Sequence, residues 1–222
     1  AADQAGLRYL NATRQSGRGM LETFERFAQQ EYVSDKYKDP FVRSHPVASD
    51  RLARLRELVE SSPYYHAKDP PELQLRHHMM RAKLAGYLER PQVVFNRYPR
   101  SDTSLPARYA RAIATFMQGG QNALPAALQQ VDALIRERPD NPYFYELKAD
   151  FLTRSGKSRE AIAPLREALR LSKGASLIRV QLASALLATN DPKVVNEAAD
   201  LLRKAIVEDE NPRAYRSLAD AY

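Results

Sequence analysis

The segment from Asn141 to Lys173 most constrains the fold, because it has the pattern of one complete helix–turn–helix unit. Pro142 suits the first position of a helix, where its missing backbone N–H costs nothing. In each predicted helix, apolar residues recur on one face at helical spacing. The first stripe is Tyr145, Ala149 and Leu152, and the second, after a turn at Ser155, Gly156 and Lys157 and a cap at Ser158, is Ala161, Leu165, Ala168 and Leu169. A unit of this size cannot bury its apolar face alone, so it requires neighbours.

Copies of the pattern lie on both sides of this unit, with a proline near each boundary. The matching positions are Tyr109, Ala112, Ile113, Phe116, Ala127, Val131 and Leu134 upstream, and Leu182, Ala183, Leu186, Ala198, Leu202, Ala205 and Ile206 downstream. A further copy begins at Asn211 and Pro212 and carries Tyr215, Leu218, Ala219 and Tyr222 in register. The sequence therefore predicts an all-α chain with a repeat array over residues 105–222.

The alternation of large and small residues resembles the tetratricopeptide repeat. That family places an aromatic residue early in its first helix, a small residue one turn later, a glycine in the turn and an alanine at the start of its second helix. Lys148 stands where the family usually has leucine, and Lys173 where it usually has proline. The resemblance implies an α-solenoid whose first helices turn one face toward a concave groove.

In this register the residues off the core face of each first helix are expected to line that groove. They are Tyr143, Glu146, Asp150 and Arg154 in the clearest unit, Val180, Ser184 and Leu187 in the next, and Arg213 and Arg216 in the last. This mixed apolar and charged surface is expected to bind an extended peptide or a partner protein.

The first sixty residues carry a second pattern. Helices are expected from Asp3 to Leu10, around Met20, Phe24 and Phe27, which are predicted core residues, and around Leu52, Leu55, Leu58 and Val59. The string from Ala2 to Leu10, then Gly19 and Met20, then Ser44-His45-Pro46 with Asp50 and Arg51, resembles the rear part of HtpX/BepA-like zinc metallopeptidases.

That resemblance implies a longer protein, because the helix with the HExxH motif and the third zinc ligand would precede Ala1. Asp3 matches the aspartate of the family's E-x-x-x-D segment and would lie beside the metal ligands. The alternative for Asp3 is a favourable charge at a helix N-terminus. His45 would belong to a loop beside the active site, with Asp50 and Arg51 fixing that loop; the alternative for His45 is a cap or packing residue.

The resemblance further implies a periplasmic zinc endopeptidase that acts in envelope protein quality control. Residues 1–60 would be the last helices of its catalytic domain, 61–104 a helical connector with helices at 71–88 and 91–98, and 105–222 the repeats. Leu75, Met79, Ala82, Ala85 and Leu88 are expected to face inward. The rival hypothesis is a repeat adaptor without hydrolytic activity.

The sequence of this chain contains no catalytic or metal-binding motif of its own. No two histidines are four apart, as a zinc helix requires. The chain has no cysteine, and its net charge of +7 is spread among acidic residues rather than clustered, which argues against nucleic acid as a partner. No apolar run is long enough for a transmembrane segment. We therefore expect this chain alone to bind no stoichiometric zinc and to hydrolyse nothing.

Overall fold

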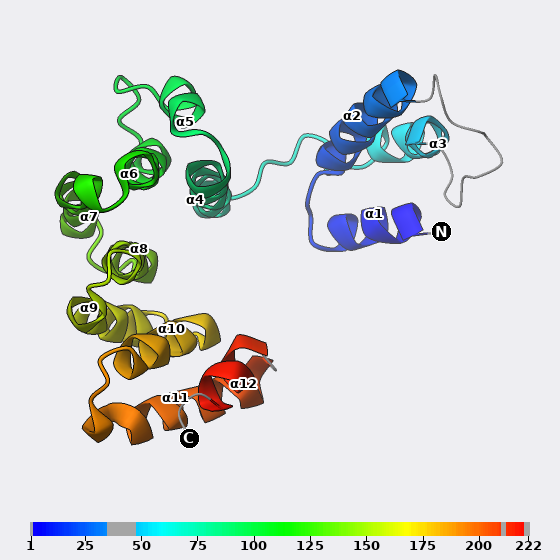
Figure 1. The fold of residues 1–222 in the computed structure, drawn as a ribbon. Coiled ribbons are helices and arrows are strands. Elements are labelled where there is room, and N and C mark those ends of the chain that lie inside the picture. Colours follow the sequence, from blue (N-terminus) through cyan, green and yellow to red (C-terminus); the bar gives the residue numbers. More distant parts are fainter. Residues whose placement is uncertain (1, 35–47, 210–211, 220–222) are drawn as a thin grey trace. The chain divides into compact units, whose positions relative to one another are not determined.

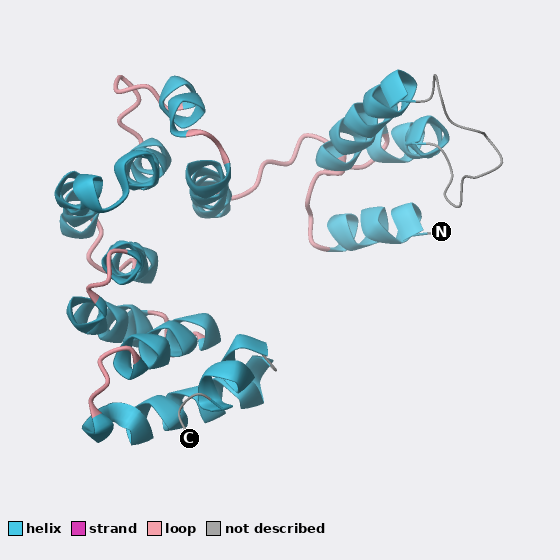
Figure 2. Ribbon diagram, in the orientation of Figure 1, coloured by secondary structure: helices cyan, strands magenta, loops and turns pink. Residues whose placement is uncertain are grey.

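A computed structural model describes residues 2–34, 48–209 and 212–219 (Figures 1 and 2). Within these ranges all regular structure is helical, which confirms the all-α prediction. Contacts divide the chain into two units, Ala1–Gln74 and Leu75–Tyr222, and the boundary falls inside one helix. Of the predicted connector 61–104, that boundary places residues 61–74 in the first unit and residues 75–104 in the second unit, together with residues 105–222.

The first unit contains α1 (Ala2–Ala12), α2 (Arg18–Ser34) and α3 (Ala48–Glu60). Its core joins all three helices through Leu7, Leu21, Phe24, Leu55 and Val59. The core prediction for Phe27 is wrong: its side chain is 49% exposed. The helix buries Leu21 and Phe24, which are three residues apart, and Phe27 extends this row beyond the edge of the small core.

The second unit begins in α4 (Pro71–Leu88), and from the next helix onward each α-helix packs against the one that follows it in the chain (Figure 1). The remaining elements are α5 (Pro91–Arg97), α6 (Leu105–Gly119), η3 (Gly120–Ala123), α7 (Leu124–Glu137), α8 (Pro142–Arg154), α9 (Ser158–Leu171), α10 (Ser176–Leu187), η4 (Pro192–Val194), α11 (Val195–Asp209) and α12 (Pro212–Ala219). This consecutive packing is compatible with a solenoid.

Helix α8 shows why neighbours are needed, because it is buried on two sides. Ala149 and Leu152, from the predicted stripe, belong to the core shared with α9, α10 and α11. Phe144, Leu147 and Phe151 lie in a second core with α6 and α7 and are fully buried. The ring of Phe151 stacks on that of Phe116, with centroids 4.4 Å apart. The single predicted apolar stripe therefore accounts for only one of the two buried sides of this helix.

The turns at the two ends of α9 differ from the expected pattern. Ser158 is the first helical residue and not the cap, which is Lys157 and makes no capping bond through its side chain. At the other end Lys173 has φ 56° and Gly174 has φ 91°. Proline is fixed near φ −65°, so it cannot adopt this left-handed turn. The turn therefore explains why Lys173 departs from the usual repeat pattern.

Helix α4 packs against α6 at Gly86, which lies beside Ile113, and Ala82 belongs to the core that contains the buried residues of α6. Leu88, predicted to face inward, is 78% exposed because it lies at the last turn of the helix, beyond the contact with α6. The loop between α5 and α6 is held by Arg111, whose Nη1 donates to the carbonyl oxygens of Tyr98, Pro99 and Asp102.

Candidate peptide-binding pocket

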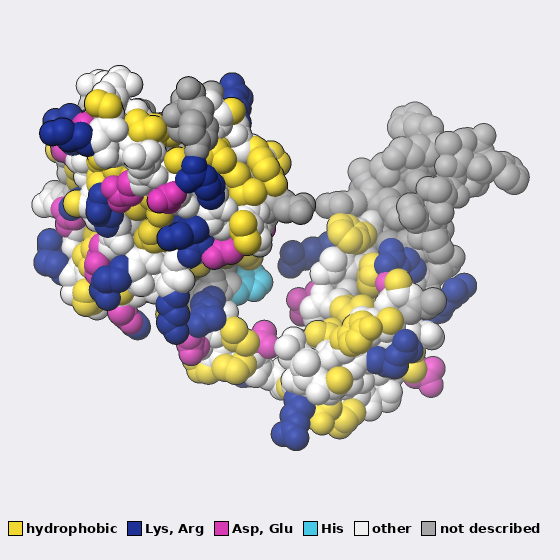
Figure 3. All heavy atoms as spheres, turned by 90° about the horizontal axis from the view of Figure 1, so that it is seen from below, with side chains coloured by type: hydrophobic (Ala, Val, Ile, Leu, Met, Phe, Trp, Pro, Cys, Tyr) yellow, Lys and Arg dark blue, Asp and Glu magenta, His cyan; other side chains and the backbone are white. Residues whose placement is uncertain are grey.

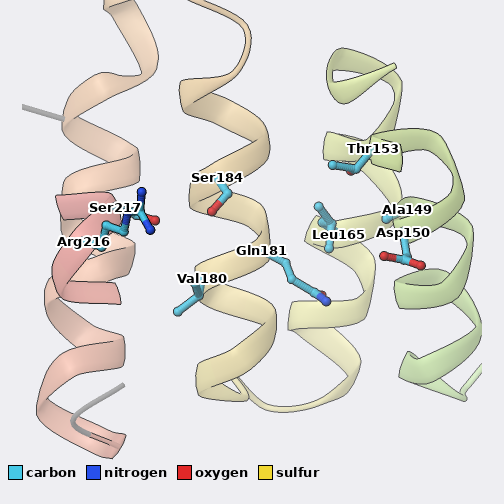
Figure 4. Close-up of a pocket in the computed structure, with 9 residues that line it drawn as sticks. All are labelled: Ala149, Asp150, Thr153, Leu165, Val180, Gln181, Ser184, Arg216 and Ser217. Carbon is cyan, nitrogen blue, oxygen red and sulfur yellow. The ribbon is translucent and has the colours of Figure 1, made fainter. Parts of the chain in front are cut away.

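A pocket of about 300 Å³ lies across α10, with walls from α8, α9 and α12 (Figure 4). Its apolar lining is formed by Ala149, Leu165 and Val180. All three are buried side chains of the core that joins α8 to α12. The hydrophobic packing of successive helices therefore forms one surface of the pocket.

Polar side chains supply the rest of the lining. Asp150 and Thr153 come from α8, on one side of α10, and Arg216 and Ser217 come from α12 on the other side (Figure 4). The hydroxyl-bearing Ser184 completes the lining from α10, together with Gln181. The pocket thus combines an apolar surface with hydroxyl, amide and charged groups.

The structure brings together four of the nine predicted groove residues: Asp150, Val180, Ser184 and Arg216. Tyr143 and Arg154 are exposed outside the pocket lining, Leu187 is partly buried against the core, and the side chain of Arg213 lies outside the described residues. The expectation for Glu146 is corrected, because this residue is only 8% exposed. Val180 is 7% exposed and forms the apolar lining rather than a protruding contact.

Glu146 is buried because two other helices satisfy its carboxylate. Lys83 Nζ of α4 donates to Oε2 over 2.7 Å, and Gln181 Nε2 of α10 donates to Oε1 over 2.9 Å. A buried carboxylate requires such partners, since an unpaired charge in the interior is strongly unfavourable. Gln181 Oε1 is itself buried and has no hydrogen-bond donor among the described residues.

Asp150 is held by a second set of contacts. Tyr87 of α4 donates its hydroxyl to Asp150 Oδ2 over 2.6 Å, and Arg154 Nε lies 3.0 and 2.9 Å from the two carboxylate oxygens. The guanidinium carbon of Arg154 lies 5.4 Å from the centre of the Tyr87 ring. Burial, together with the charge of Asp150, raises the pKa of Tyr87 well above its usual range, so the phenol remains a donor.

Sequence reasoning missed the pocket residues Thr153, Gln181 and Ser217, and it missed the contacts of Lys83 and Tyr87. Gln181 carried a usable signal, because it is a polar residue directly between the apolar Val180 and Leu182 and buried polar groups are nearly always bonded. Lys83 and Tyr87 carried none, since each lies 63 residues from its partner.

Lys148, the departure from the repeat pattern, is paired in the structure. Its Nζ donates to Asp132 Oδ1 of α7 over 2.8 Å. A leucine at this position would fill the same space but leave that carboxylate without its cation. The lysine therefore links two neighbouring helices on a side of α8 that does not line the pocket.

In the first unit, Asp3 and Arg51 form a two-pronged ion pair. Arg51 Nε donates to Oδ2 over 2.8 Å and Nη2 to Oδ1 over 2.5 Å, and the guanidinium lies 4.3 Å from the centre of the Phe24 ring. These hydrogen bonds lower the pKa of Asp3. His45 lies outside the described residues, and the side chain of Asp50, which belongs to α3, is outside them too.

The described residues contain no group of three side chains able to hold a metal ion. None of the helices described is both long enough and apolar enough to cross a membrane. On the face of the molecule in Figure 3, Lys and Arg side chains alternate with Asp and Glu over the second unit, as the mixed charge pattern predicts. Comparison with models of protein families, with curated proteins and with solved structures gives no match.

Proposed function

We propose that the repeat region binds an extended segment of a polypeptide in the pocket across α10. The observation that supports this proposal is the convergence of Asp150, Val180, Ser184 and Arg216 from three different helices on one pocket. These residues occupy the positions that the repeat register assigns to the inner surface of a solenoid.

The size and chemistry of the pocket favour a peptide over a cofactor. A volume of about 300 Å³ is at the lower end of ligand sites, which suits one or two residues of a chain rather than a larger organic molecule. Ala149, Leu165 and Val180 match an apolar side chain. The hydroxyl groups of Thr153 and Ser184 suit the backbone amides on either side of that side chain.

The hydroxyl groups of Thr153 and Ser184 are exposed at the pocket, and each can accept a hydrogen bond, which favours a ligand with N–H groups. A peptide presents such a donor at each residue other than proline. We therefore expect binding to depend on the backbone and on one apolar side chain more than on a long sequence motif.

A blocking substitution tests this proposal. Ser184 is exposed at the pocket, so Ser184→Trp fills it without disturbing the core. The matched control is Ala163→Trp, which adds the same side chain at an exposed position of α9 outside the pocket lining. The probe is fluorescein-labelled, dephosphorylated β-casein, an unfolded polypeptide, and binding is followed by fluorescence anisotropy.

We expect the unchanged chain and Ala163→Trp to bind casein equally, and Ser184→Trp to bind at least ten-fold more weakly. The proposal is wrong if the unchanged chain does not bind casein, or if the two tryptophan variants bind it alike. Circular dichroism of both variants verifies that each keeps its helical content.

We also propose that the first unit belongs to an HtpX/BepA-like zinc endopeptidase of the periplasm, to which the repeats supply polypeptide substrates. The observation that favours this is the pairing of Asp3 with Arg51, because these residues come from the two separate segments that carry the resemblance. In such an enzyme Asp3 and Arg51 would orient the helix that bears the third zinc ligand.

The test for this second proposal uses the full-length gene product. It should contain an HExxH helix, cleave casein, and lose that activity when a chelator is added. His45→Ala should then change the peptidase activity without changing the helical content. A gene product that lacks the HExxH motif would instead support a repeat adaptor with no hydrolytic role.

A further inference from the structure

Two side chains of α4 reach the wall of the pocket from outside it. Lys83 and Tyr87 are four residues apart and lie on one side of α4, and their partners Glu146 and Asp150 have the same spacing on α8. Of the helices between them in sequence, α6 contributes the fully buried Ala110 and Ala114 to the core that also contains Ala82 of α4. Small residues there leave room for α4 and α8 to approach each other.

One of these contacts ends at a residue that lines the pocket, and the other ends at a residue bonded to the lining. Asp150 lines it directly and receives the hydroxyl of Tyr87. Lys83 contacts the lining indirectly. It bonds one carboxylate oxygen of Glu146, and the other oxygen accepts a hydrogen bond from the side-chain amide of Gln181, which lines the pocket (Figure 4). The polar groups of two pocket walls are thus oriented by a helix that contributes no lining residue.

We infer that Lys83 and Tyr87 are positioning residues of the peptide-binding pocket, and that the docking of α4 onto α8 is coupled to peptide binding. This inference rests on the proposed function. Charge supports it: Lys83 and Arg154 balance the carboxylates of Glu146 and Asp150. When α4 separates, Glu146 loses its cation and the hydrogen bond from Gln181 changes its strength and direction.

The coupling acts in both directions, because an effect of α4 docking on affinity requires an equal effect of the peptide on docking. Peptide binding then stabilises the docked position of α4, the helix through which the chain passes from the first unit to the second. Occupation of the pocket is in this way transmitted to the segment that joins the two units.

The experiment compares three variants in the casein-binding assay. Tyr87→Phe removes the hydroxyl that bonds Asp150, and Lys83→Met removes the cation that bonds Glu146. Lys148→Met is the matched control, because it breaks an ion pair of similar length between α8 and α7 that does not involve a pocket residue. Circular dichroism and thermal unfolding are measured for each variant.

We expect both α4 variants to bind casein at least five-fold more weakly, a factor typical of coupled sites, while Lys148→Met binds like the unchanged chain. A purely structural role for Lys83 and Tyr87 would lower the unfolding temperature and leave affinity unchanged. If the α4 variants and the Lys148 variant have the same affinity, the coupling is refuted even when Ser184→Trp weakens binding at least ten-fold.

Hydrogen exchange in the unchanged chain gives a second measurement that does not depend on any variant folding. Addition of saturating casein should slow exchange of the backbone amides between Met79 and Leu88 by the same factor that the variants lose in affinity. Unaltered exchange in this part of α4, with protection of α8 and α10, would overturn the inference while leaving the proposed function intact.

Discussion

At Gly86 the sequence and the structure predict opposite changes in stability when the glycine is replaced by alanine. Gly86 lies inside α4, where replacing glycine by alanine ordinarily stabilises a helix by about 1 kcal/mol. In the structure, a β-carbon at Gly86 would lie 2.7 Å from Ile113 Cβ and 2.9 Å from Ile113 Cγ2, distances that real β-carbons essentially never show. Ile113 is fully buried in α6, so α4 and α6 must separate.

The expected change in the free energy of unfolding follows from two opposing contributions, the helix propensity of alanine and the clash with Ile113. Overpacking costs roughly 1–3 kcal/mol, and the upper part of that range applies because one clashing atom is the β-carbon of Ile113, which no rotamer change can move. After subtraction of the helix propensity term, Gly86→Ala should lower the free energy of unfolding by about 1–2 kcal/mol. In a protein of this size the unfolding temperature should fall by roughly 2–8 °C.

Thermal unfolding followed by far-UV circular dichroism measures the effect. The control is Gly19→Ala in α2, where a β-carbon would meet no atom within 4 Å. This control should keep or slightly raise the unfolding temperature. The proposed packing of α4 on α6 is refuted if Gly86→Ala raises the unfolding temperature as well, since the close approach to Ile113 would then not exist.

Four further outcomes are expected. Arg111→Met should destabilise the second unit by about 2 kcal/mol in urea titrations, because the loop between α5 and α6 loses its three hydrogen bonds to the guanidinium; an unchanged midpoint would contradict this. Asp3→Asn should cost about 0.5–1 kcal/mol at neutral pH, since the pair with Arg51 is partly exposed. Because the pKa of Asp3 is lowered in the folded state, its contribution is present above about pH 4 and is lost as the pH falls through the folded value; wild type and variant should therefore converge in acid unfolding curves. Burial raises the pKa of both Tyr87 and Tyr109, so these two phenols should stay protonated in a spectrophotometric titration until the protein unfolds in alkali. Metal analysis of this chain after dialysis should find no stoichiometric zinc, because a catalytic site needs three protein ligands and the described residues hold no such group; one tightly bound zinc per chain would overturn this.

Local periodicity in the sequence was sufficient to predict the helical class and most helix positions. The helix predicted over residues 71–88 is α4, and the unit beginning at Pro142 is the pair α8 and α9. Spacing of apolar residues determines which face of a helix avoids water, and this information is local. The same register placed Asp150, Val180, Ser184 and Arg216 on a common surface, and the structure brings them to one pocket.

Tertiary packing determined which helices lie beside one another and which distant residues pair, and the periodicity of apolar residues does not contain this information. The register could not show that Phe144 and Phe151 occupy a second core, because the two buried sides of α8 depend on which helices lie beside it. It also treated Glu146 as a groove residue, although Lys83 satisfies and buries it from 63 residues away. Pairings over such distances depend on the small residues that let helices approach. The sequence by itself therefore determined the helices and their apolar faces, whereas the pocket and its connection to α4 depend on how those faces pack together.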